Sequence, residues 1–140
     1  MMMEERENPV REAQDVRPEG PDHPLIPAGR VNGTEVYSPS GEKLGKIEDV
    51  ALEKVSGEVA YAIVSFGGFL GLGSEHHPVP WRMLRYDLGL RGYVIPCEKE
   101  QLKAAPGIDR DALSGWDDAI EREGIYNFYG PYGARPYWMP

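Results

Sequence analysis

The sequence lacks the features that mark secreted and membrane-spanning proteins. Its 140 residues contain a single cysteine, Cys97, so no disulfide can form within the chain, as is usual in a reducing compartment. No stretch approaches the roughly 20 apolar residues that cross a bilayer. The N-terminus has no basic segment followed by an apolar one, so it does not resemble a signal peptide. We therefore expect a cytoplasmic protein without membrane insertion.

The sequence also lacks an excess of positive charge. The net charge is −8, and the first 29 residues, with seven acids against three bases, account for half of it. Residues 30–108 have ten acids and nine bases, and residues 109–140 have six acids and three bases. Binding a nucleic-acid backbone needs a concentrated basic surface that displaces counterions. The composition therefore predicts no nucleic-acid partner.

Histidine is scarce, which limits catalytic and metal chemistry. The three histidines stand at His23, His76 and His77, and no Ser/His/Asp arrangement can be inferred from these positions. Adjacent residues of a strand point to opposite faces, so His76 and His77 cannot chelate one ion; we expect one to be solvated and the other half-buried. Cys97 is interpreted as an inert thiol. The sequence thus predicts no catalytic residues, no metal, no cofactor and no enzymatic activity.

Glycine and proline, by contrast, are abundant, with 17 and 13 residues, which favours short strands and turns over long helices. Turn signals separate six apolar segments that are joined without crossover helices. We therefore expect a mainly β fold, a small closed six-stranded antiparallel β-barrel. The predicted strands are residues 31–37, 43–53, 59–66, 76–81, 84–88 and 93–96.

Three of these strands carry further structural information. The apolar positions of residues 43–53 do not alternate cleanly, which predicts a β-bulge near Glu48 and Asp49. Residues 59–66 are apolar at both parities, so both faces should be covered, either within the domain or by a neighbouring molecule. Pro78 and Pro80 lack an N–H donor, which places their strand at a sheet edge.

The flanks of this region differ in composition. Residues 1–29 hold five prolines and ten charges and are expected to form a flexible acidic tail. Residues 30–107 form the barrel domain. Residues 108–140 contain a candidate helix at 109–123, with Trp116 and Ile120 on one face, and then an aromatic tail. We expect this C-terminal part to pack on the barrel or on a neighbouring protomer. A short helix is predicted at 98–105.

A glycine-rich loop at residues 67–73 carries large apolar side chains where loops are normally polar. No lysine follows it and no helix is predicted there, which disfavours a phosphate-binding loop. Two interpretations stay open: an exposed apolar surface for a protein partner, or a loop folded back over the barrel mouth. Together with the aromatic tail, the loop supplies the candidate protein-contact residues, which are Phe69, Leu70, Leu72, Tyr126, Phe128, Tyr129, Tyr137 and Trp138.

The order and spacing of several segments are similar to the PRC-barrel family, which includes the cytoplasmic domain of the photosynthetic reaction-centre H subunit. The resemblance covers residues 31–107, and the end of the chain resembles a stand-alone bacterial branch, at Tyr129-Gly130 and Pro136-Tyr137-Trp138. The segments that carry it are residues 41–49, 56–61, 65–71, 79–81 and 102–106, with Leu84 and Tyr86.

This resemblance implies a six-stranded β-barrel that makes protein–protein contacts and has no catalytic residues to transfer. We therefore expect a non-enzymatic interaction or assembly module that is homo-oligomeric and whose further partner is unknown. Two alternatives stay open. One is a small-molecule or metal-responsive sensor that uses the barrel mouth, and the other is an accessory factor of a membrane-bound photosynthetic or respiratory complex.

The first prediction concerns the glycine-rich loop. If Leu70 is part of an exposed contact surface, Leu70→Asp leaves the free energy of unfolding within about 0.5 kcal/mol of the wild type, as surface substitutions usually do. The same substitution weakens a partner or self-contact. Thermal denaturation and light scattering measure the two effects. A large loss of thermal stability places Leu70 in the core instead.

Overall fold

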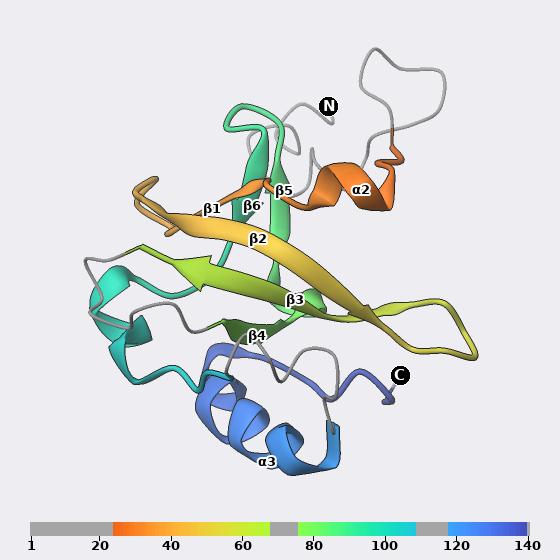
Figure 1. The fold of residues 1–140 in the computed structure, drawn as a ribbon. Coiled ribbons are helices and arrows are strands. Elements are labelled where there is room, and N and C mark those ends of the chain that lie inside the picture. The colour runs from red at the N-terminus through yellow and green to blue at the C-terminus, as the bar shows by residue number, and fades with distance from the viewer. Residues whose placement is uncertain (1–23, 68–75, 109–117, 140) are drawn as a thin grey trace, which may run out of the picture.

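The computed structural model describes residues 24–67, 76–108 and 118–139 of the chain. Its strands form one sheet that curls strongly, and α3 packs beneath β4 (Figure 1). The strands are β1 (Glu35–Tyr37), β2 (Lys43–Leu52), β3 (Val59–Phe66), β4 (His77–Pro80), β5 (Arg85–Asp87) and β6 (Gly92–Val94). The helices are α2 (Ala28–Val31), α3 (Asp118–Tyr129) and the 3₁₀ turns η3 (Trp81–Met83), η4 (Lys99–Ala104) and η6 (Gly130–Tyr132).

The sheet has the strand order β4-β3-β2-β1-β6-β5, and all of its pairs except one are antiparallel. The exception corrects the expectation of a wholly antiparallel barrel: β1 and β6 run parallel, with Val36 opposite Tyr93. Turn signals specify pairings between consecutive strands, but this pair joins strands far apart in the sequence, so no local signal set its direction. The six strands and the mainly β class are confirmed.

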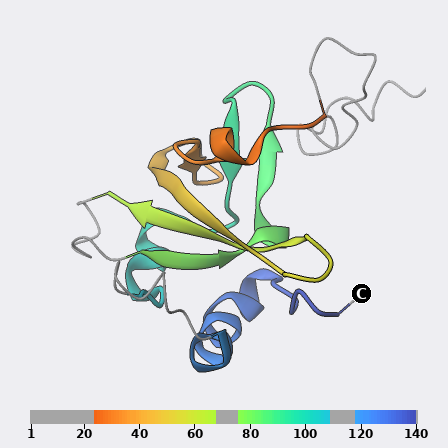
Figure 2. The same cartoon turned by 45° about the vertical axis from the view of Figure 1, so that its right-hand side comes forward.

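The expected closed barrel is also corrected, because the two edge strands of the described sheet, β4 and β5, do not pair with each other. These strands follow each other in the chain and are joined by η3 and Leu84. The β5–β6 hairpin consequently stands across the direction of β2 and β3 (Figures 1 and 2). Within the described residues, the chain itself closes the corner between β4 and β5.

The irregular features predicted for the central strands are present. The β2–β3 register shifts between Ile47 and Asp49, which confirms the bulge. β3 has the predicted bounds, and β4 lies at the sheet edge with Pro78 opposite Ile63. Every β3 residue from Ala60 to Val64 is buried within the single chain. Both faces of this strand are therefore covered within the chain, which is one of the two alternatives that the sequence left open.

The first predicted strand, 31–37, is shorter than expected, because Ala28–Val31 forms the helical turn α2 and the strand begins only at Glu35. Gly33 has φ +91°, a left-handed conformation that interrupts an extended strand. The Thr34 hydroxyl donates to the Arg30 carbonyl at 2.9 Å and thereby stabilises the turn. The pattern of apolar residues did not reveal this turn.

The helices after the sheet also differ from expectation in extent. Residues 98–105 contain the 3₁₀ helix η4, whose start is fixed by a capping box between Glu98 and Gln101. α3 runs to Tyr129, six residues past the predicted end at 123, so part of the expected irregular tail is helical. Ile125 and Tyr129 are fully buried at i, i+4 spacing, and this packing outweighs the low helix propensity of Gly124. Residues 1–23 and Trp116 lie outside the described residues.

The second prediction uses two glycines in different environments. A Cβ on Gly45 would overlap the Ser65 carbonyl oxygen and lie 2.9 Å from Phe66 Cα, so Gly45→Ala forces β2 and β3 apart. We expect a loss of about 1–3 kcal/mol in the free energy of unfolding, as for other overpacked sites. The matched control is Gly124→Ala, where no atom lies within 4 Å. This change removes a helix-interior glycine and should stabilise by about 0.5–1 kcal/mol. Urea denaturation measures both, and equal effects of the two substitutions contradict the prediction.

Candidate interaction surface

The aromatic residues predicted for protein contact take different positions in the structure. Tyr129 is fully buried, and the partly buried Phe128 packs edge-to-face on it with ring centroids 4.7 Å apart. Tyr129 therefore contributes to the core. Trp138 is 50% exposed and is the most accessible of the described candidates. Phe69, Leu70 and Leu72 lie outside the described residues.

Tyr126 and Tyr137 form the cover of the β3 surface. Both rings are partly buried against Tyr61, which is itself almost fully buried, with centroid distances of 6.1 and 5.7 Å. The Tyr137 backbone N–H donates to the Tyr126 hydroxyl at 3.2 Å. Trp138 then packs edge-to-face on both tyrosines. One continuous network, which begins in the core and ends at the surface, is thus formed by Tyr61, Tyr126, Tyr137 and Trp138.

One arginine that sequence reasoning missed holds this network in place. The Arg82 guanidinium, in η3, donates to the carbonyl oxygens of Met139 at 2.6 Å, Tyr137 at 3.0 Å and Pro136 at 3.4 Å. We call residues 134–139 the C-terminal strap. A guanidinium has five donors in a fixed plane, so it can bind several carbonyls of one segment. No local pattern pairs residue 82 with residues 136–139, and the contact exists only in the folded chain.

A hollow of about 380 Å³ lies between helix α3 and the strap. Its strap wall is formed by Pro136 and Trp138, and the Arg122 guanidinium lies 5.0 Å from the centroid of the Trp138 ring, within the range of a cation–π interaction. We call this hollow the strap groove. Its lining residues are Arg122, Glu123, Tyr126, Asn127, Pro136 and Trp138.

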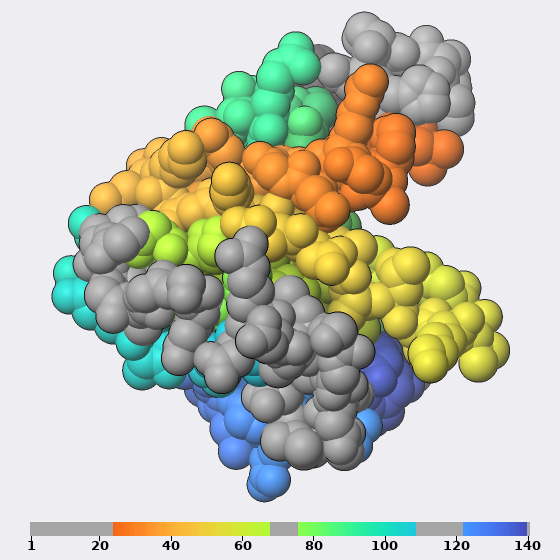
Figure 3. Space-filling model, viewed as in Figure 1, coloured from red at the N-terminus to blue at the C-terminus, as the bar shows by residue number. Residues whose placement is uncertain are grey.

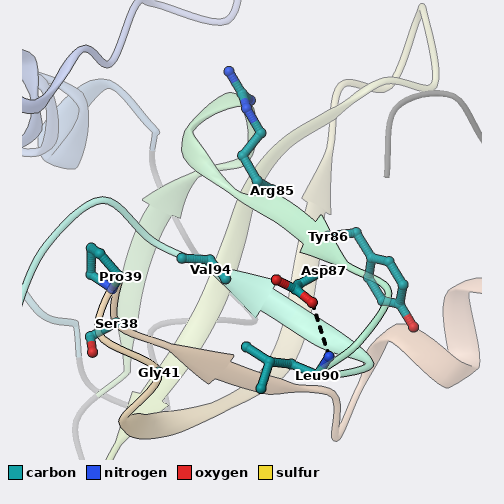
Figure 4. Close-up of a pocket in the computed structure, with 8 residues that line it drawn as sticks. All are labelled: Ser38, Pro39, Gly41, Arg85, Tyr86, Asp87, Leu90 and Val94. Atoms are coloured by element: carbon teal, nitrogen blue, oxygen red, sulfur yellow. Dashed lines mark hydrogen bonds between the residues drawn. The ribbon is translucent and has the colours of Figure 1, made fainter. Parts of the chain in front are cut away.

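A second hollow, of about 270 Å³, lies beside the β5–β6 hairpin (Figure 4). Its charged side chains form hydrogen bonds with backbone groups of the same chain. The Asp87 carboxylate accepts the N–H groups of Gly89 and Leu90 at 2.8 and 3.0 Å, and Arg85 donates to the Arg82 carbonyl at 3.1 Å. The carboxylate thus stabilises the hairpin turn. Asp87 and Arg85 of the hollow therefore have a structural role in the hairpin and its neighbouring turn.

Both β4-region histidines are buried, which corrects the expectation that one is solvated and the other half-buried. The His77 ring packs on Phe66, and its Nδ1 lies 3.0 Å from the Pro106 carbonyl oxygen. The His76 backbone pairs with Ile108. Residues 106–108 cover this edge, which sequence spacing did not indicate. Among the described residues, no three His, Cys, Asp or Glu side chains are placed to hold a metal ion.

The comparison with protein families matches residues 25–102, more than half of the chain, to the PRC-barrel domain. The chain belongs to the PRC-barrel family. The search of the curated proteins found no match. PRC-barrel domains are generally non-catalytic. None of the described helices of this PRC-barrel protein is long and apolar enough to cross a membrane.

The cysteine of this PRC-barrel protein lies in its core. Cys97 is fully buried, and this burial raises the pKa of its thiol to about 11. Only the thiolate is a good nucleophile, so the buried thiol is chemically quiet near neutral pH. Since the folded pKa lies above the ordinary value of 9.0, this group favours unfolding as the pH rises from 9 towards 11.

The third prediction follows from this burial. Native protein at pH 8 reacts with a thiol-specific disulfide reagent far more slowly than protein in denaturant, because the thiol is both inaccessible and protonated. The reaction is followed by absorbance, with free cysteine as the control for reagent activity. Equal labelling rates in native and denatured protein would show that Cys97 is accessible.

Proposed function

We propose that this PRC-barrel protein is a non-enzymatic protein–protein interaction module that associates with itself. The observation that carries the proposal is the pair of apolar side chains Trp138 and Met139, which are 50% and 43% exposed at the end of the strap. Their backbone is fixed by Arg82, so the side chains are presented in a set conformation at little cost in entropy. Exposed apolar groups on an ordered segment are typical of contact surfaces.

The distribution of the charged groups supports the same proposal. The ion pairs of the described residues join Lys43 to Glu35, Lys99 to Glu42 and Lys103 to Glu100, all at the surface. Such pairs contribute little to stability or chemistry. Catalysis by acid and base groups needs several of them around one site, with their pKa values shifted towards neutrality. The charged groups of the described surface therefore fit a protein that binds a partner through the apolar side chains of the strap better than they fit an enzyme.

The proposed contact residues come from two parts of the chain. The described aromatic network includes Trp138, Tyr126 and Tyr137, with Trp138 as its accessible end. Phe128 is partly buried and packs on the buried Tyr129. The loop residues, which are Phe69, Leu70 and Leu72, remain candidates on sequence grounds.

The fourth prediction tests self-association directly. Light scattering of the purified full-length protein across the micromolar range should give a mass above the 15.6 kDa of one chain, and the mass should rise with concentration. High salt should leave most of the association intact, because its main contribution is apolar burial. A mass of one chain at every concentration contradicts self-association.

A further inference from the structure

The sequence on the N-terminal side of the domain contains a proline repeat. Pro18, Pro21, Pro24 and Pro27 recur at every third residue. Polyproline II helices have three residues per turn, so a repeat of this kind aligns the proline rings along one edge. The described end of the repeat has the matching backbone, since Pro27 has φ −63° and ψ 142°.

The same segment exposes apolar side chains between its prolines. Leu25 is 76% exposed and Ile26 is 41% exposed, and Pro24 and Pro27 on either side of them are exposed as well. Large aliphatic side chains at this level of exposure lose contact with water only if another surface covers them. Residues 24–27 therefore present an uncovered apolar surface.

The strap groove has the chemistry that binds such a ridge. Proline-rich segments dock in grooves lined by aromatic rings, and the wall of this groove combines Trp138, Tyr126 and Pro136. The rings of Trp138 and Tyr126 meet edge-to-face at 5.8 Å, which fixes the shape of the wall. Asn127 adds an exposed amide donor for the backbone carbonyls that a polyproline II helix leaves without internal partners.

Charge also suits this pairing. Arg122 and Glu123 place one cation and one anion on the groove wall. The proline segment carries Glu19 and Asp22 and is preceded by Arg17. Opposite charges on two surfaces raise the rate at which the surfaces associate and fix their relative orientation.

The positions of the two features decide which molecule supplies the segment. Pro24 and Pro27 lead directly into α2, which packs beside β2, whereas the groove is formed by α3 and the strap below β4. Figures 1 and 2 both show α2 and α3 at opposite ends of the domain. The described prolines therefore cannot reach the groove of their own chain.

We propose that the proline segment, residues 18–27, of one chain docks in the strap groove of a second copy. The segment and the groove are different surfaces, so the contact is heterologous and joins copies head to tail. This inference rests on the self-association proposed above and names the surfaces that produce it.

The fifth prediction is tested first with a fluorescent peptide of residues 17–28. The receptor is the full-length chain with Pro21→Ala and Pro24→Ala, so that its own segment does not compete. Anisotropy should show saturable binding. Trp138→Ser in the same chain weakens this binding by about tenfold or more, because it removes the largest ring of the wall. Asn127→Arg, which fills the groove from an exposed helix position, is the second variant and should do the same.

The control for these variants is Leu90→Ser. Leu90 is 38% exposed on the turn between β5 and β6, at the opposite end of the domain from α3 (Figure 3). This substitution removes an exposed apolar side chain away from the groove, so peptide affinity should stay unchanged. Thermal denaturation of each variant checks that the fold is intact.

A complementation experiment then identifies the second copy as the source of the segment. The Trp138→Ser chain keeps its segment, and the Pro21→Ala, Pro24→Ala chain keeps its groove, so each alone should have the mass of one chain. An equimolar mixture should form a one-to-one complex with about twice the 15.6 kDa mass.

The outcomes separate this inference from the broader proposal. In one outcome the wild type associates, the Trp138→Ser chain and the Pro21→Ala, Pro24→Ala chain each have the same oligomer mass as the wild type, and the peptide does not bind. That outcome overturns the pairing of segment and groove, while self-association stands. If the wild type is a monomer and the peptide still binds in a Trp138-dependent way, the groove receives a proline-rich segment of another protein. That result overturns the second copy as occupant.

Discussion

The structure depends on burying strand β3 on both of its faces. Successive residues of a strand point to opposite sides, and the residues from Ala60 to Val64 are apolar and buried at every position. Each large side chain among them contributes about 1.5–3 kcal/mol when it is removed from water. β2 and β4 satisfy the backbone at the two edges of β3, but a sheet alone cannot cover its outer face. The ring of Tyr61 is covered by Tyr126 and Tyr137, so α3 and the strap complete the core.

This requirement explains why the end of the chain is ordered despite its glycines and prolines. The strap cannot form a regular helix or pair in the sheet, so its carbonyl groups need another donor. Arg82 supplies that donor from η3, the turn that links the two edge strands of the sheet. The same turn therefore links the two edge strands and fixes the strap. As a result, the accessible ring of Trp138 has a defined position relative to the barrel.

Polar groups of the described residues, both at the surface and in the core, also have structural roles. Asp87 caps its own hairpin turn, His77 lies at hydrogen-bond distance from a carbonyl of the segment that covers it, and Cys97 is held as a neutral thiol. Such engaged groups fit a scaffold that presents surfaces at its two ends. One end carries the strap groove and the other carries Pro24 and Pro27, which is the arrangement that the proposed head-to-tail assembly requires.

Several elements could be predicted from the amino-acid sequence because their signals are local. Alternation and turn residues set the bounds of β3, the bulge in β2, the edge position of β4 and the β5–β6 hairpin, because each depends on a few neighbouring residues. The order of several short motifs also identified the family. Other features depend on tertiary contacts and were not predicted: the parallel β1–β6 pair, the burial of both histidines, the extension of α3 past Gly124 and the contact of Arg82 with the strap. These features join residues far apart in the chain, and their energies come from packing and hydrogen bonds that no local pattern encodes.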